Sequence, residues 1–269
     1  MEFMNTLLEL DPNHILFVLI IVFFVLETFI NRPKSVGSKI NHLLQNFLFQ
    51  VIVFAMGSLL AFMIITTYGW IDDYQLGLFN WIAVPYWLKI TAGIILLDFS
   101  DYWVHRWDHR FPLLWRQHRV HHSDTSMDAS TSLRVYPTDL IFFTVGEMAI
   151  SVIFGIDIMS MNIFLFFLIP ILFLQHTNLN YPVWIDKTLG WFLMMPNYHK
   201  VHHEQDQFYT DSNYGTLFIL WDKLFGTFKT KPVKEINYGL KEFIGPDKQS
   251  FLYQIRSPFM NIRPVDKES

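Results

Sequence analysis

The residues best suited to chemistry are histidines, which gather in three short groups. Of the eleven histidines in the chain, eight lie within 105–109, 118–122 and 199–203. The first group has the spacing H-x-x-x-H and the other two repeat H-x-x-H-H, so the imidazoles of each group share one face of a helix. Neutral imidazole is the commonest metal ligand. Three such groups therefore predict a metal centre.

The supply of ligands predicts more than one ion. One zinc or iron ion takes about four to six ligands, and His176 adds a ninth candidate to the eight clustered histidines. Two ions fit this supply better than one. The chain has no cysteine, which excludes thiolate zinc sites and Fe–S clusters. Spacing alone leaves iron, copper and zinc open, and the H-E-x-x-H motif of zinc proteases is absent.

The composition indicates that these histidines belong to a membrane protein. Hydrophobic residues make up 52% of the chain and aromatic residues 17%, with a mean hydropathy of +0.26. These values depart from those of soluble globular domains. The formal net charge is −4, so no general basic surface indicates a nucleic-acid partner.

Five apolar runs predict the helices that position the histidines. Residues 14–30 and 47–68 approach the roughly 20 apolar residues that a spanning helix needs. Residues 82–97 are predicted to form a third membrane helix. The runs 140–156 and 161–174 fall short of a full span, so we expect them to form a tight, re-entrant helical hairpin.

Charged loops predict how the chain is oriented. The loop after the first run holds Arg32, Lys34 and Lys39, whereas the loop after the second holds Asp72 and Asp73. The positive-inside rule then puts the amino terminus outside. An even number of crossings brings every histidine group to the cytoplasmic side.

These elements together predict an all-α integral membrane bundle with a histidine-rich helical cap on its cytoplasmic side. We expect about three spanning helices plus the hairpin. The predicted regions are an N-terminal transmembrane region at 1–97, a histidine-box catalytic region at 98–230 that includes the hairpin at 140–174, and a polar C-terminal tail at 231–269.

At this point the residues resemble the fatty acid hydroxylase and sterol desaturase superfamily. Its members carry H-x-x-x-H followed by two H-x-x-H-H boxes in a membrane protein. The likeness extends to the flanking residues, with D-Y-W-V-H-R at 101–106, N-Y-G at 213–215 and W-D-K-L-F-G-T at 221–227. It is continuous over 98–227.

The resemblance implies a di-iron enzyme that uses O2 to hydroxylate or desaturate a lipid, whether fatty acyl, sterol-like or ether lipid. The metal ligands that it implies are His105, His109, His118, His121, His122, His176, His199, His202 and His203. Because haem, flavin and Fe–S motifs are absent from the sequence, electrons are expected from a separate reductase or electron carrier.

Polar residues near the boxes are candidates to support the ligands. A ligating histidine usually donates its second ring N–H to a carboxylate or a carbonyl. The candidate carboxylates are Asp98, Asp101, Asp211 and Asp222. Each of them fits a helix cap or a solvated charge equally well. Many relatives carry R-x-H-P-x-E after the second box, whereas this chain reads R-V-Y-P-T-D at 134–139, with Tyr136 at the histidine position. This departure leaves the substrate open.

Four arginines alternate with the first two boxes. They are Arg106, Arg110, Arg116 and Arg119. Anchoring beside lipid headgroups is favoured for them over docking of an acidic electron donor.

Two other functions are compatible with the same histidines. A zinc-dependent membrane hydrolase would use the metal to activate water, and metal content together with O2 consumption distinguishes it from an oxygenase. A metal-ion transporter would relay ions through the bilayer. The transporter is disfavoured because the boxes follow the apolar runs instead of lying inside them.

Overall fold

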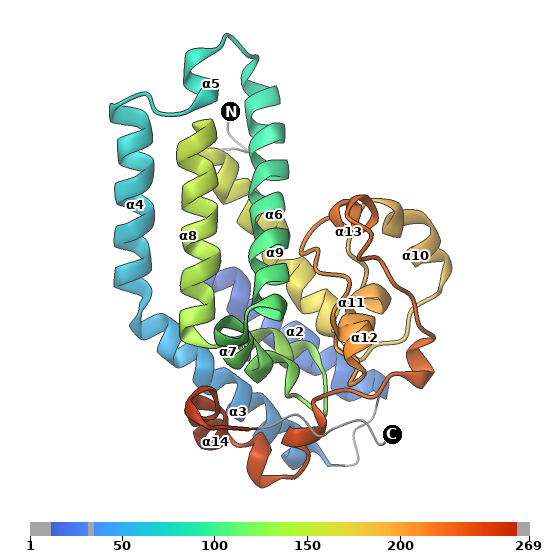
Figure 1. Ribbon diagram of the computed structural model, residues 1–269. Coiled ribbons are helices and arrows are strands. Elements are labelled where there is room, and N and C mark those ends of the chain that lie inside the picture. The colour runs from blue at the N-terminus through green and yellow to red at the C-terminus, as the bar shows by residue number, and fades with distance from the viewer. Residues whose placement is uncertain (1–11, 32–34, 263–269) are drawn as a thin grey trace.

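A computed structural model describes residues 12–31 and 35–262 of the chain. The secondary structure of these residues is helical, apart from two isolated β-bridges (Figure 1). The helices are α2 (Pro12–Asn31), α3 (Val36–Ala55), α4 (Gly57–Asp73), α5 (Leu78–Trp81), α6 (Tyr86–Arg110), α7 (Pro112–His122), α8 (Pro137–Phe154), α9 (Ile158–His176), α10 (Trp184–Thr188), α11 (Pro196–His202), α12 (Gln207–Thr210), α13 (Leu220–Leu224) and α14 (Phe251–Arg256). The predicted all-α fold class is confirmed.

Four long helices, α4, α6, α8 and α9, form an upright bundle (Figure 1). Helices α6 and α8 pack closely at Gly146, where a Cβ would lie 2.8 Å from both Ser100 Oγ and Val104 Cγ2. Only a residue without a side chain fits there. Tyr68, Leu97 and other buried apolar side chains fill the bundle core.

The expected short hairpin is wrong in its lengths. α8 has 18 residues and α9 has 19, and both are long and apolar enough to cross a membrane. The predicted runs begin and end at apolar residues. In the structure, α8 already begins at Pro137 and α9 continues to His176, so each helix includes polar residues at one end. Between the two helices, Gly155 adopts a left-handed φ of 70°, and the Asp157 side chain caps α9.

The predicted helix at 47–68 is also corrected, because the chain bends at Met56. α3 ends at Ala55 and α4 begins at Gly57, with an angle of 51° between the segments Val36–Ala55 and Gly57–Trp81. The two segments together are apolar enough to form one broken span. They extend the protein in different directions.

The first apolar run forms α2, whose apolar stretch Leu16–Ile30 is shorter than a full span. Two of the basic residues that predicted orientation, Arg32 and Lys34, lie outside the described residues. Lys39 lies in α3 and is buried, where its Nζ is 3.1 Å from Glu27 Oε2 of α2. It therefore joins two helices and is no loop charge.

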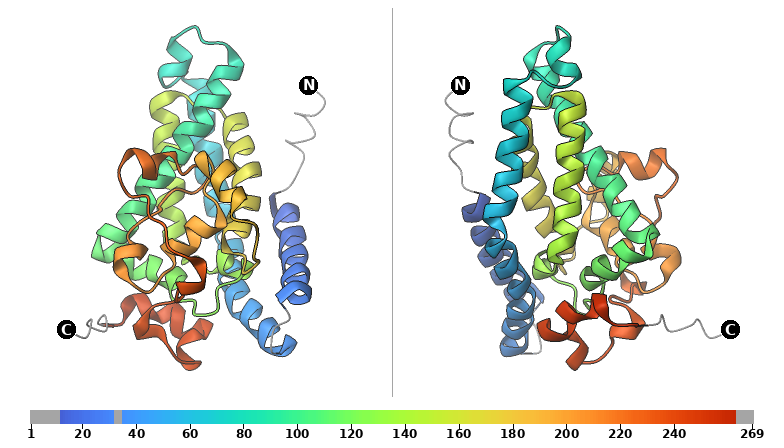
Figure 2. Two further views of the ribbon diagram at one scale, coloured as in Figure 1. Left: turned by 90° about the vertical axis from the view of Figure 1, so that its right-hand side faces the viewer. Right: turned by 60° about the vertical axis from the view of Figure 1, so that its left-hand side comes forward.

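A lobe of short helices, α10 to α13, projects sideways from α6 and α9, and α14 covers the lower end of the molecule (Figures 1 and 2). The predicted third run begins α6 at Tyr86. This helix continues for 25 residues to Arg110, so it extends without interruption into the region of the lobe. The second half of α6 carries the first histidine box.

Candidate metal centre

Five of the predicted ligands converge in a first group. His105 and His109 lie one turn apart on α6, His118 and His122 lie on α7, and His202 lies on α11. One ligand nitrogen from each lies within 4.8 Å of all the others. His118 Nε2 is 3.1 Å from His105 Nε2 and 3.2 Å from His122 Nε2. Among the described residues, nothing bonds to the buried Nε2 atoms of His109 and His202.

The other four predicted ligands form a second group. His121 comes from α7, His176 from the last residue of α9, and His199 and His203 from α11 and its C-terminal cap. His176 Nε2 lies 3.1 Å from His121 Nε2 and 3.0 Å from His199 Nε2. His199 Nε2 is 3.1 Å from His203 Nε2. This group also brings its four nitrogens to within 4.8 Å of one another.

The two groups lie side by side. The rings of His122 and His203, one from each group, are stacked with centroids 4.5 Å apart. The spacing H-x-x-H-H explains this division, because its adjacent histidines turn in different directions: His121 joins the second group and His122 the first. Each triplet thus supplies ligands to both groups.

Hydrogen bonds fix the ring orientation of six of the nine histidines. In each of these rings, Nδ1 faces either a backbone carbonyl oxygen or a carboxylate oxygen. An ionised carboxylate, like a carbonyl, can only accept a hydrogen bond. The pairs are His105 with Tyr214 O at 2.7 Å, His109 with Asp211 Oδ1 at 3.2 Å, His118 with Asp139 Oδ2 at 2.9 Å, His121 with Arg134 O at 3.3 Å, His176 with Leu172 O at 2.6 Å and His202 with Ser212 O at 2.6 Å. The ring proton therefore sits on Nδ1, and Nε2 presents a bare lone pair.

Burial keeps these imidazoles neutral. Desolvation, followed by the neighbouring His118, lowers the pKa of His202 to about 3. Desolvation and nearby imidazoles also hold the pKa values of His105 and His203 well below the usual range. Neutral rings with bare Nε2 atoms about 3 Å apart repel one another unless a cation lies between them. The donor set thus fits metal ions, with all ligands nitrogen.

Among the four carboxylates expected behind the ligands, Asp211 contacts a histidine and the others bind elsewhere. Asp98 accepts hydrogen bonds from Leu217 N and from Trp221 Nε1, so it holds the loop before α13. Asp222 accepts from Tyr214 N and Gly215 N. Asp222 therefore supports a predicted ligand indirectly, because it holds Tyr214, whose carbonyl oxygen is the partner of His105 Nδ1. Asp101 is buried on α6 beside Glu147.

Asp139 is the supporting residue that sequence reasoning missed. It lies in the first turn of α8 and accepts the hydrogen bond of His118 Nδ1. Asp108 is buried nearby, where desolvation and then Asp139 raise its pKa to about 10. The available signal was the last position of the motif at 134–139, where relatives carry another carboxylate.

Tyr136, which replaces the family's usual histidine, faces away from both ligand groups. Its ring packs in a small core cluster with Phe49 and Val120. Its hydroxyl donates to Ile255 O of α14 at 3.3 Å. The residue thus fastens the C-terminal segment to the start of α8.

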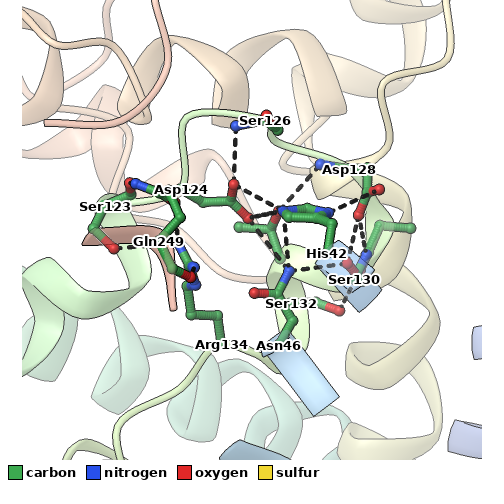
Figure 3. Close-up of polar contacts among 12 residues, drawn as sticks. His42, Asn46, Ser123, Asp124, Ser126, Asp128, Ser130, Ser132, Arg134 and Gln249 are labelled. Atoms are coloured by element: carbon green, nitrogen blue, oxygen red, sulfur yellow. Dashed lines mark hydrogen bonds and ion pairs between the residues drawn. The ribbon is translucent and has the colours of Figure 1, made fainter. Parts of the chain in front are cut away.

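A polar network holds the loop after the second box against α3 (Figure 3). His42 Nε2 lies 2.9 Å from Asp124 Oδ2, and His42 Nδ1 lies 3.3 Å from Asp128 Oδ2. Asn46, one turn further along α3, donates to Ser130 Oγ at 2.9 Å. This network fixes the segment that follows His121 and His122. His42, which lies outside the three histidine boxes, therefore has a structural role.

The arginines between the boxes have different surroundings. Arg119 is buried and donates to Ser257 O at 2.7 Å, so it is not a headgroup anchor as expected. Arg106 donates to Tyr102 Oη at 3.2 Å and lies over the Trp103 ring. Arg110 and Arg116 are exposed.

Comparison with known proteins identifies the family. The family model described as fatty acid hydroxylase matches residues 90–227, which contain all nine clustered histidines. The chain belongs to the fatty acid hydroxylase family. The matched range begins within α6 and ends after α13, so the family region includes both ligand groups and every helix that carries them.

Individual relatives of this fatty acid hydroxylase family member act on lipids, as their names state. The chain is 31% identical over 191 residues to human alkylglycerol monooxygenase, covering 65% of this chain and 38% of that protein. It is 26% identical over 180 residues to an ornithine lipid hydroxylase of Rhizobium tropici, covering 65% and 51%. A very-long-chain aldehyde decarbonylase of rice is 27% identical over 169 residues, covering 60% and 62%. No solved structure matches the chain.

The chain therefore spans less than two fifths of the length of the human alkylglycerol monooxygenase that it matches. With its apolar helices and family membership, it is an integral membrane protein.

Proposed function

We propose that this protein is a membrane di-iron oxygenase that hydroxylates a lipid, with a glycerol ether lipid as its substrate class. The observation that carries the proposal is the pair of buried histidine groups, whose bare Nε2 atoms converge at 3.0–3.2 Å. Two iron ions fit this arrangement, one to each group. When bound, they would supply the O2 activation that no side chain can perform.

The overall reaction defines what else is needed. One O2, one substrate C–H bond, two electrons and two protons give one C–OH group and one water. We propose that a separate reductase or small electron carrier supplies the two electrons. The protein residues hold the ligands, keep them neutral and exclude water from the buried centre.

The choice of substrate class rests on the relatives. Alkylglycerol monooxygenases of several animals match the chain, at 31% identity for the human protein and 30% for that of zebrafish. The name of these relatives identifies an alkylglycerol, which is a glycerol ether lipid, as their substrate. An ornithine lipid or a long-chain aldehyde is the substrate class of other relatives and is tested alongside.

For orientation, we propose that the histidine groups face the cytoplasm. Asp72 and Asp73 close the end of α4 that lies away from the lobe, whereas the exposed Arg110 and Arg116 lie at the histidine end. This distribution of charge follows the positive-inside rule.

The test is to purify the full chain in detergent, measure its iron content, and supply an alkylglycerol with O2 and an electron donor such as photoreduced ferredoxin. We expect about two iron ions per chain, one per ligand group, O2 consumption, and a product heavier by one oxygen atom. His121→Ala should lose iron and product, whereas Arg116→Ala, on the exposed side of the same helix, should keep its iron.

Other outcomes would point elsewhere. A zinc-loaded protein that cleaves a lipid without consuming O2 would indicate a hydrolase. An iron-loaded protein that oxidises an ornithine lipid and leaves alkylglycerol unchanged would keep the oxygenase and replace the substrate class.

A further inference from the structure

The lobe carries a group of large apolar side chains that the metal centre does not use. They belong to α10 and its N-terminal cap, to the 3-10 helix η2 (Leu189–Trp191) and its C-terminal cap, and to α13, and each is between 47% and 70% exposed. We call this group the aromatic face. Its members are Val183, Trp184, Leu189, Trp191, Phe192, Leu220 and Leu224.

Backbone contacts make the aromatic face one continuous surface. Leu193 and Phe218 form an isolated antiparallel bridge, and Ile219 N donates to Phe192 O at 2.9 Å. Lys223 of α13 donates to Gly190 O at 2.9 Å, and its Nζ lies 5.2 Å from the centroid of the Trp191 ring. These contacts hold the segments around 190 and 220 together.

The position of this surface relates it to the spanning helices. In Figure 1, α10 and α13 lie at the end of the lobe that reaches up beside the middle of α6, and both views of Figure 2 show the same height. α14 lies at the opposite, lower end of the molecule. If only water surrounded the lobe, exposing these apolar side chains beside the apolar bundle would be unfavourable.

We propose that the aromatic face rests in the lipid bilayer beside the spanning helices, as a membrane contact separate from them. Tryptophan and phenylalanine with lysines at the rim, here Lys187 and Lys223, are the composition of the membrane–water interface. Groups of exposed apolar side chains of this kind mark contacts with a membrane or a partner. The lipid leaflet would cover it, with its side chains entering the headgroup boundary by about 5–10 Å.

The inner side of the same segment contacts the residue that precedes a predicted ligand. Gln175, which precedes the ligand His176, donates through Nε2 to Met194 O at 3.1 Å. Met194 N in turn donates to Leu217 O at 2.9 Å. These hydrogen bonds connect the segment of the aromatic face to the residue beside His176.

The absence of cysteine makes the test direct. Single substitutions Trp184→Cys, Phe192→Cys and Leu224→Cys are labelled with a nitroxide in the full chain, reconstituted into phosphatidylcholine vesicles with a minor share of phosphatidylglycerol. Collision rates with O2, which concentrates in hydrocarbon, are compared with those of a water-soluble nickel chelate. Phe259→Cys, at an 82% exposed position of the lower end, is the aqueous control, and Ile65→Cys, 71% exposed on α4, is the bilayer control.

The proposal expects the three aromatic-face labels to resemble Ile65→Cys, with several-fold more O2 collisions relative to nickel than Phe259→Cys shows. Labels that resemble Phe259→Cys would overturn it. Labels shielded from both reagents, with spin–spin broadening, would overturn it as well, because a second copy of the chain would then cover the face. These readouts do not depend on metal or activity, so they stand apart from the proposed oxygenase function.

Discussion

At the scale of single residues, we expect Asp139 to strengthen the binding of metal by His118. Its carboxylate accepts the Nδ1 proton of His118 at 2.9 Å, which raises the basicity of Nε2. Asp139→Asn keeps an acceptor oxygen and removes the charge. We expect the affinity for Fe(II) to fall about 10–100-fold, as is usual for such partners, measured by competition with a chelator.

Asp98→Asn is the informative contrast, because Asp98 is equally buried and binds backbone N–H groups instead of a histidine. Asp98→Asn should therefore mainly lower the melting temperature and change the iron affinity little. Equal iron affinities for Asp139→Asn and the wild type would remove Asp139 from the support of the metal. Exposed Asp247→Asn should change neither quantity.

At the scale of elements, the C-terminal segment is fastened to the second histidine box by Arg119. The guanidinium donates to Ser257 O at 2.7 Å and to Met260 O at 3.4 Å. Ser257 and Met260 are the first residue and the C-terminal cap of the 3-10 helix η6 (Ser257–Phe259). Arg119→Met would remove these charge-assisted hydrogen bonds and leave Ser257 O and Met260 O with only the backbone N–H groups of Met260 and Ile262 as donors. We expect a loss of about 1–3 kcal/mol in the free energy of unfolding, together with faster proteolysis after α14.

Arg116→Met, on the same helix and exposed, is the matched control and should leave both measurements unchanged. If Arg119→Met unfolds like Arg116→Met and keeps its protease resistance, the fastening of this segment must come from other contacts, such as that of Tyr136 with Ile255 O.

Elements also show what the sequence could predict and what it could not. Imidazole spacing is a local, helical property, so the pattern at 118–122 predicted that these histidines gather at one centre. It did not predict that His121 joins one group while His118 and His122 join the other. The bend at Met56 and the distance from His118 to Asp139 depend on how α3, α4 and α8 pack, which no local pattern contains. Tertiary contacts likewise turned Arg119 inward and made Lys39 an interhelical partner.

At the scale of the whole molecule, buried neutral imidazoles link stability to pH. In the folded protein His202 has a pKa of about 3, against an ordinary value of 6.5. The unfolded chain therefore takes up protons first on acidification. The stability that depends on a neutral His202 is full above pH 6.5 and is lost progressively as the pH falls toward 3.

Metal binding adds to this dependence, because the same rings must be neutral to bind a cation. Removing metal with a chelator should lower the melting temperature at neutral pH, since bound metal stabilises the folded state by mass action. For metal-free protein, we expect the melting temperature to fall further between pH 7.5 and pH 5. A melting temperature of the metal-free protein that stays flat across this range would mean that the imidazoles take up protons in the folded protein as readily as in the unfolded chain. The convergence of bare Nε2 atoms would then have no physical basis.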